Sequence, residues 1–238
     1  MPARVTVVSS PGASDAVDKT AGAESMADLI IRHIKNGVRS GKYVPGQRLI
    51  EGDIQDATGA SRGPVREAMR RLAAEGLLEI PHQKGARVRR LNRTEIETLY
   101  DLREAIEGLA ARHAAANIGM ETYRARLKAA LSSFESVYDG SPQSYMDYNE
   151  RFHGLIIEIS RNEFLAKLLV QLQLPLFMMR LHAAINFVGA EKAHEQHLVI
   201  GKAILDGESR RAELEMRKHI RSTKRGVLGA MFSSIEPL

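Results

Sequence analysis

Residues 61–90 constrain the fold of this 238-residue chain more than any other segment does. A serine and a proline form a helix-start signal, three arginines follow within the helix, and Gly76 ends it. A mostly apolar run at 77–80 then leads to a Gln-Lys-Gly turn and a basic strand at 87–90. A helix, a hairpin and clustered arginine together predict a winged helix-turn-helix, a motif that binds DNA.

The sequence before this segment supplies the rest of the motif. Ser25 is expected to cap a first helix, and the apolar pair 49–50 suits a short strand. Residues 51–58 form a short second helix that Gly59 ends, and a tight turn leads into the third helix at 62–75. Two helices joined by a short turn containing glycine are the signature of a helix-turn-helix.

The distribution of charge agrees with this interpretation. Residues 1–91 hold 15 Lys+Arg and 10 Asp+Glu, whereas residues 92–238 hold 19 of each, so the whole basic excess lies in the N-terminal part. A basic cluster alone is most often a solvated face. Because these basic residues fall on a helix-turn-helix pattern, we expect them to bind nucleic acid.

Composition excludes several other classes of protein. The chain has no cysteine, so a disulfide framework is excluded and any metal site must use histidine, carboxylate or amide ligands. No apolar run reaches the length of about 18 residues that a membrane span needs. Residues 1–24 lack the apolar region of a secretory signal and are expected to be a flexible leader. A cytoplasmic protein without a membrane partner is therefore predicted.

The third helix and the wing offer specific DNA contacts. Arg62 and Arg66 are four residues apart and share one helix face, and arginine suits bidentate contact with guanine O6 and N7 or with phosphate. Arg70 continues this face and is expected to meet backbone phosphate. At the wing tip, Gly85 would allow a close approach to the minor groove or the sugar-phosphate backbone, with Lys84 beside it.

The run PGQRLIEGDIQDATGASRGPVREAMRRLAAEGLLEIPHQKGARV resembles the N-terminal domain of GntR-family bacterial transcriptional regulators. The resemblance covers about residues 25–91, and many fixed offsets agree at once. Gly52 stands where some members of the family have an arginine. The DNA contacts that the resemblance implies are Ser61, Arg62, Pro64, Arg66 and Gly85.

The second part of the chain, residues 92–238, is expected to be helical almost throughout. Apolar residues recur at helical spacing, and sustained strand-like alternation is absent. An all-α bundle of antiparallel helices is the natural architecture, with Pro175 interrupting the fourth helix. The six predicted helices are 94–117, 121–138, 141–160, one that starts at 162, 189–207 and 208–232.

The candidate ligand-binding residues of this part are mainly histidines. Asn149 and His153 are four residues apart on one helix face, and His197 and His219 lie on the last two helices. Three neutral imidazoles with one oxygen ligand suit zinc first, with nickel, manganese or iron as alternatives. The competing interpretation is that these histidines are hydrogen-bonded core residues, the commoner role of a lone histidine on a half-apolar helix.

A second resemblance bears on that choice. NERFHGLIIEISRN and HLVIGKAILDGESRRAELEMRKHI resemble the signature segments of the FCD domain, the ligand-binding partner in the FadR-type subfamily of GntR regulators. Metal-binding members of that family use one acidic residue and three histidines. In this chain Asn149 stands at the acidic position, and its amide oxygen could ligate without adding charge. The implied ligand set is Asn149, His153, His197 and His219.

Two interpretations of Arg103 compete. It could pair with Glu107, four residues along its own helix, or it could point into the bundle and clamp a ligand carboxylate bidentately. The segment DLREAIEGLAARHAA is similar to a family helix, and the resemblance favours the second role. Arg180, beyond Pro175, is a further candidate for binding an effector.

These features together predict a ligand-responsive transcriptional regulator. It would be a homodimer through its helical domain, bind a two-fold DNA operator, and respond to a small organic acid held on a metal ion and Arg103. Two alternatives stay open. One is a metal-dependent enzyme that uses the Glu150/His153 and Glu191/His194 pairs, and the other is a constitutive DNA-binding protein without an effector.

Overall fold

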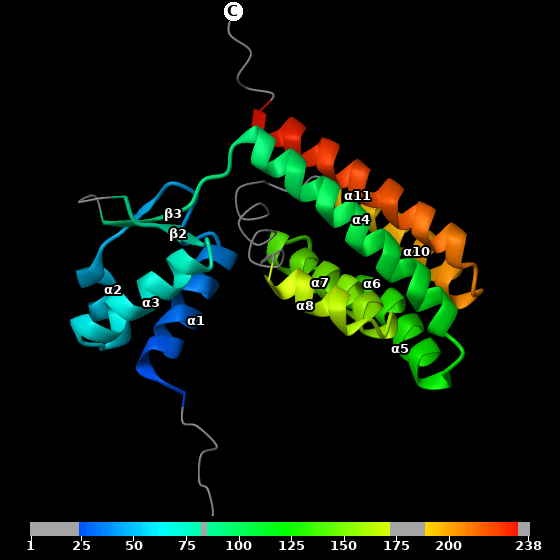
Figure 1. Cartoon of the computed structure of the whole chain (residues 1–238), viewed down its shortest axis with the longest axis horizontal. Helices are drawn as coiled ribbons and strands as arrows, with labels where there is room; N and C mark the ends of the chain where they lie inside the picture. Colours follow the sequence, from blue (N-terminus) through cyan, green and yellow to red (C-terminus); the bar gives the residue numbers. More distant parts are fainter. Residues whose placement is uncertain (1–23, 82–84, 172–188, 233–238) are drawn as a thin grey trace, which may run out of the picture.

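A computed structural model of the chain describes residues 24–81, 85–171 and 189–232. It has two parts, a small N-terminal head that precedes residue 92 and a larger helical domain that follows it, and a single connecting segment joins them (Figure 1). The predicted fold class, a mainly α protein with a winged helix-turn-helix before an all-α bundle, is confirmed. The predictions that concern Lys84, Pro175, Arg180 and the leader up to residue 23 lie outside the described residues.

The head combines three helices with a small sheet. The strands follow the order β1-β3-β2, so β3 lies in the centre and pairs antiparallel with both neighbours. Leu78 pairs with Val88, which places β2 and β3 in the hairpin that forms the wing. The elements of the head are α1 (Met26–Arg39), β1 (Arg48–Leu49), α2 (Glu51–Thr58), α3 (Arg62–Ala74), β2 (Leu78–Glu79) and β3 (Ala86–Val88).

Local signals set the ends of these helices. Ser25 and Asp28 form a reciprocal capping box at the start of α1, which satisfies two backbone N–H groups that the helix itself cannot. Gly59 ends α2 with φ +67°, a left-handed conformation that costs glycine little, and this helix has the bounds that the sequence predicts. The first helix ends at Arg39, and Gly41, shortly after it, has a left-handed φ of +74°.

An apolar core holds the head together. Side chains of α1 and α3 make up half of its buried residues, and the sheet adds residues from β1, β2 and β3. Val65, Met69 and Leu72 of α3 are all buried in this core. The arginines of α3 therefore lie on the opposite, exposed side of that helix.

The helical domain packs its longest helices together. In Figure 1, α4 and α11 run side by side in opposite directions, and α10 packs against both of them. Helix α7 lies against α4 and α5. The helices are α4 (Arg93–Asn117), α5 (Glu121–Ser132), α6 (Phe134–Val137), α7 (Pro142–Ile159), α8 (Glu163–Gln171), α10 (Ala190–Leu205) and α11 (Ser209–Phe232).

One predicted helix is divided in the structure. The prediction of a single helix over 121–138 is wrong, because α5 ends at Ser132 and α6 begins at Phe134. The hydroxyl of Ser133 donates to the backbone oxygen of Ala130, and such a local bond competes with helix continuation. Among the described helices, none combines the length and the apolar character that crossing a bilayer requires.

Candidate metal centre and nucleic-acid interface

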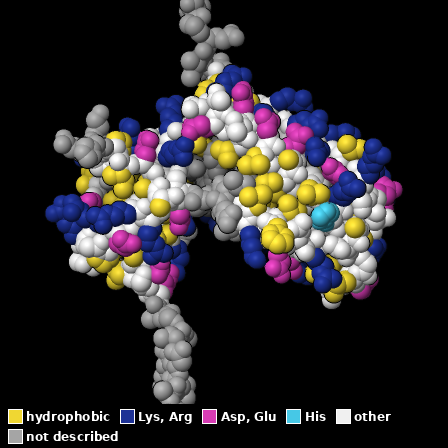
Figure 2. All heavy atoms as spheres, in the orientation of Figure 1, with side chains coloured by type: hydrophobic (Ala, Val, Ile, Leu, Met, Phe, Trp, Pro, Cys, Tyr) yellow, Lys and Arg dark blue, Asp and Glu magenta, His cyan; other side chains and the backbone are white. Residues whose placement is uncertain are grey.

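The start of α3 presents its arginines to solvent. The side chains of Arg62 and Arg66 are 67% and 49% exposed, and Arg70 is exposed as well. Ser61 occupies the N-cap position with an extended backbone, but its hydroxyl makes no capping hydrogen bond. Figure 2 shows basic side chains projecting from the edge of the head. The predicted recognition face is therefore accessible, with Pro64 half-buried behind it.

The wing keeps the glycine that the sequence singles out. Gly85 is exposed and has φ +73°, in the left-handed region that favours glycine. A Cβ atom at this position would lie 3.2 Å from Nε of Arg48, which belongs to the neighbouring strand β1. A larger residue would both strain the backbone and crowd Arg48, so the turn requires glycine.

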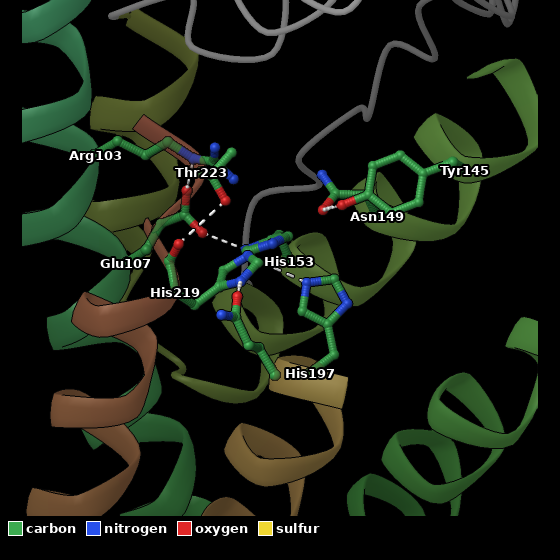
Figure 3. A network of polar contacts seen from close by, with 9 residues as sticks. Arg103, Glu107, Tyr145, Asn149, His153, His197, His219 and Thr223 are labelled. Atoms are coloured by element: carbon green, nitrogen blue, oxygen red, sulfur yellow. Dashed lines mark hydrogen bonds and ion pairs between the residues drawn. The ribbon is translucent and has the colours of Figure 1, made fainter. Parts of the chain in front are cut away.

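Three histidines from three helices meet in the helical domain (Figure 3). His153 of α7, His197 of α10 and His219 of α11 are 6%, 0% and 1% exposed, and their ligand atoms lie within 4.8 Å of one another. The Nε2 atoms of His197 and His219 are 3.2 Å apart. The Nε2 atom of His153 is buried and has no hydrogen-bond partner among the described residues. The structure thus brings together three of the four predicted ligands.

The other ring nitrogen of each histidine is held by a different residue. Nδ1 of His153 contacts a carboxylate oxygen of Glu107, and Nδ1 of His219 lies 2.8 Å from Oε1 of Gln196. Nδ1 of His197 lies 3.4 Å from the hydroxyl of Tyr148. Holding Nδ1 fixes the orientation of the ring and leaves Nε2 as the ligating atom.

Burial sets the protonation state of this cluster. Burial first, and then the neighbouring imidazoles, lower the pKa of His197 and of His219 well below the ordinary value of 6.5. Both rings are therefore neutral near neutral pH. A neutral imidazole is the form that ligates a metal ion.

A buried ion pair lies beside the histidines. Nε of Arg103 donates to Glu107, and the second carboxylate oxygen of Glu107 contacts His153. Burial alone would raise the pKa of Glu107, but its ion pair with Arg103 and its contact with His153 outweigh burial and hold that pKa well below its usual range. The pairing interpretation of Arg103 is therefore confirmed.

Asn149, the fourth predicted ligand, contacts a tyrosine. Its Oδ1 atom lies 3.3 Å from the hydroxyl of Tyr145, which precedes it by one helical turn on α7 (Figure 3). Its side chain is half-buried, on the helix face that also carries His153. Asn149 therefore borders the histidine cluster, while the only carboxylate that contacts the cluster within the described ranges is Glu107.

This donor set fits a divalent transition-metal ion. Three imidazoles converge, one of their Nε2 atoms is buried without a partner, and each Nδ1 atom already has one. Simple core histidines would be expected to use both ring nitrogens in hydrogen bonds. The unpartnered Nε2 atom of His153 thus favours the metal interpretation.

The pairs that suggested an enzyme do not assemble. Glu150 is exposed and accepts from Arg39 of α1, 2.7 Å away, instead of facing His153. Glu191 is exposed, and His194 contacts the hydroxyl of Tyr148 at 2.7 Å and stacks on Phe134. A two-metal carboxylate site requires inward glutamates, and these two glutamates lie at the surface.

Comparison with known proteins places each part of the chain. Residues 26–88 match the pattern of the bacterial regulatory proteins of the gntR family, and residues 98–222 match the FCD domain. The probable D-xylose utilization operon transcriptional repressor of Paenarthrobacter nicotinovorans is 29% identical over 211 residues, covering 87% of this chain and 89% of its own length. The HTH-type transcriptional repressor GlaR of Escherichia coli is 27% identical over 197 residues, covering 79% and 90%.

Solved structures share the fold. E. coli McbR/YncC has a TM-score of 0.72 at 20% identity, covering 85% of this chain and 97% of that one. A GntR regulator from Rhodococcus sp. RHA1, itself described as putative in function, has a TM-score of 0.71 at 20% identity, covering 86% and 98%. Both relatives named above carry the name of transcriptional repressor. The chain belongs to the GntR family of bacterial regulatory proteins and carries an FCD domain after its winged helix-turn-helix.

Proposed function

We propose that this transcriptional regulator binds a two-fold operator as a homodimer and responds to a small organic acid, held together with a divalent metal ion in the helical domain. The observation that carries the proposal is the convergence of His153, His197 and His219, with one Nε2 atom buried and unpartnered. The family membership supports the DNA-binding part.

Base reading would fall to the start of α3. The exposed guanidinium groups of Arg62 and Arg66 suit guanine edges in the major groove, and Arg70, further along the helix, suits phosphate. Ser61 and Pro64 would place the helix start against the backbone, with Gly85 and Lys84 of the wing beside it. An operator affinity that did not fall with rising salt would contradict the phosphate contacts.

Zinc is the first choice for the ion, with nickel, manganese and iron as alternatives. Bound on three imidazoles, such an ion would supply a positive charge with open coordination positions for an anionic ligand. The charges of Arg103 and Glu107 offset each other, and His197 and His219 are neutral, so these residues would leave the charge of the ion uncompensated. This balance favours an anionic effector.

Two side chains of α4 would orient the acid. Arg103 is 4% exposed and donates Nε–H to Glu107, and its planar guanidinium would meet a carboxylate of the effector. The ring of Tyr100 lies 5.7 Å from the Arg103 guanidinium. Burial raises the pKa of Tyr100 to about 12, so its hydroxyl keeps its proton and can donate a hydrogen bond. Arg180 stays a further candidate for this role.

Self-association would use the helical domain. Phe164 and Leu168, one turn apart on α8, are 83% and 38% exposed, an unusual placement for large apolar side chains. Figure 2 shows apolar side chains gathered on the exposed face of the helical domain. Covering them with a second copy would give the two-fold symmetry that a two-fold operator requires.

A polar contact joins the proposed site to the head. Nη2 of Arg39, at the end of α1, lies 2.5 Å from Asp147 and 2.7 Å from Glu150 on α7, the helix that carries His153. Within the described ranges, the only other ion pair between the two parts is Arg89 with Glu95 at the connecting segment. A shift of α7 on effector binding would therefore act directly on the placement of the head.

The test uses full-length protein purified without chelators. Elemental analysis should find about one ion per chain, lost in a His197→Ala variant and kept in His113→Ala. Panels of mono-, di- and tricarboxylic acids should then change the affinity for a selected DNA duplex by about 5- to 150-fold. Metal-free protein whose DNA affinity no acid alters would contradict the proposal and favour a constitutive DNA-binding protein.

A further inference from the structure

Glu51 joins the two arginines that are proposed to read DNA. Its Oε2 atom accepts from Nε of Arg62 at 3.0 Å. Its Oε1 and Oε2 atoms accept from Nε of Arg66 at 3.0 and 3.1 Å. Glu51 opens α2, whereas both arginines lie in the first turns of α3, so one carboxylate bridges the two helices of the helix-turn-helix.

The atoms used in this bridge leave a particular edge of each guanidinium available. Each arginine donates through Nε, and among the described residues no other ion pair involves either side chain. The terminal Nη atoms still carry four N–H groups, and two such groups can meet guanine O6 and N7 together. The carboxylate therefore holds each arginine from behind without occupying the edge that would read a base.

A stabilising role explains the bridge less well. All three side chains are substantially exposed, at 67%, 49% and 33% for Arg62, Arg66 and Glu51, and exposed pairs contribute little to stability. The two helices already share a buried apolar core that includes Ile54 and Val65. The two arginines outweigh partial burial and lower the pKa of Glu51, so its carboxylate is ionised near neutral pH.

We propose that Glu51 is a positioning residue for DNA sequence discrimination. It fixes the directions of Arg62 and Arg66, and its negative charge lowers their attraction to phosphates at unrelated sequences. An arginine held in place loses less side-chain entropy on contact with the correct base, whereas a carboxylate beside the DNA disfavours contacts that lack this compensation. The inference rests on the proposed base reading by these arginines.

The experiment compares DNA preference, not affinity alone. A duplex is selected by the wild-type protein from a library with a randomised core, and a scrambled duplex of equal length serves as the unselected probe. Glu51→Gln keeps the shape of the side chain but removes the charge and one of the two accepting oxygens, so it holds the two arginines less firmly. We expect the ratio of the two affinities to fall about tenfold, with unselected binding strengthened about two- to threefold.

Asp53→Asn is the matched control. Asp53 is an exposed acid in the same helical turn, and its substitution removes the same charge as Glu51→Gln does. It should leave the affinity ratio within about twofold of wild type, since no ion pair joins it to either arginine among the described residues. Equal effects of the two substitutions would show that Glu51 acts only through its negative charge, and would overturn the inference. Equal losses on both duplexes in Glu51→Gln would show a structural role and also overturn it.

Arg62→Ala and Arg66→Ala separate this inference from the proposal beneath it. If neither variant changes the base preference at any operator position, the proposed base reading itself is wrong. If both variants change it while Glu51→Gln leaves the preference intact, only the role of Glu51 is wrong. Thermal unfolding of each variant, followed by circular dichroism, verifies that the head remains folded.

Discussion

The head and the helical domain each contain an arginine–glutamate pair, and the two pairs lie in opposite surroundings. In the head, Arg66 and Glu51 pair in solvent, with side chains 49% and 33% exposed. In the helical domain, Arg103 and Glu107 pair with side chains only 5% and 7% exposed. Exposed pairs add little stability, whereas breaking a buried pair leaves a charge without compensation. Loss of the Glu51 carboxylate should therefore leave the head folded, whereas loss of the Glu107 carboxylate should destabilise the helical domain.

Helix α4 contains the same comparison within one element. Arg93 and Glu97 form an ion pair at four-residue spacing with side chains 63% and 38% exposed. Arg103 and Glu107 have the same spacing and the same chemistry, but they are buried. Helix propensity and spacing are matched, so any difference in energy between the pairs comes from their surroundings.

The largest expected effect on stability follows from the comparison of these two ion pairs of α4. Glu107→Ala should lower the free energy of unfolding by about 3–5 kcal/mol, because Arg103 would stay buried without its partner. Glu97→Ala should cost less than about 1 kcal/mol. Urea denaturation of metal-free protein measures both values. Similar costs for the two variants would show that burial does not distinguish the two pairs.

Acid should destabilise the helical domain through its histidines. The pKa values of His197 and His219 are lowered in the folded protein, so below pH 6.5 the unfolded chain binds more protons than the folded chain does. Their contribution to stability is therefore full above pH 6.5 and is lost as the pH falls below it. Each histidine can contribute a slope of up to about 1.4 kcal/mol per pH unit.

Urea denaturation with a chelator present measures how the free energy of unfolding changes with pH. Between about pH 5 and 6.5 most carboxylates are already ionised, so they contribute little to this slope. A His197→Gln variant should reduce the slope by up to half, since one of the two titrating groups is gone. A free energy of unfolding that stays constant over this window in the wild-type protein would contradict the buried, neutral state of both rings.

For the exposed arginines of the head, substitution should change DNA binding but not the stability of the fold. Arg66→Ala should weaken binding to a selected duplex by about 1–3 kcal/mol, because a bidentate base contact is lost. Its free energy of unfolding should change by less than about 0.5 kcal/mol. Fluorescence anisotropy and urea denaturation give the two numbers. Arg112→Ala, an exposed arginine of the helical domain, is the control that should change neither.

The smallest effect concerns the amide at the edge of the histidine cluster. Asn149→Asp would place a carboxylate one helical turn before His153, and we expect metal affinity to rise about tenfold. Competition with a chromophoric chelator measures it. Asn162→Asp serves as the control, because Asn162 caps α8 through its side-chain oxygen and aspartate can do the same. Unchanged affinity in the Asn149 variant would place that residue outside the metal's coordination shell.

The elements of the head could be predicted closely because their signals are local. The serine cap of α1 and the left-handed glycine after α2 act within a few residues, and both lie where the sequence indicates. The third helix could be oriented as well, because its apolar stripe and its arginines fall on opposite faces. In the helical domain, by contrast, the break between α5 and α6 at Ser133 was not predicted, because a hydroxyl that bonds to its own helix leaves no sign in the apolar periodicity.

The histidine cluster could be predicted only in part. Helical spacing and family resemblance indicated His153, His197 and His219, but not what holds their Nδ1 atoms. Glu107, Tyr148 and Gln196 do this across helix–helix contacts, and such contacts depend on how each helix is rotated in the bundle. Periodicity fixes which face of a helix is buried, but not which buried side chains meet. Glu51 was missed for the same reason, since its partners lie on the next helix.

The three histidines come from α7, α10 and α11, so an ion bound between them would act as a cross-link between distant parts of the chain. Such a link restricts the fluctuations in which helices separate locally and expose their backbone amides to exchange with deuterium. Loading the site should thus slow exchange at the centre of all three helices at once, while the helices of the head keep their rates.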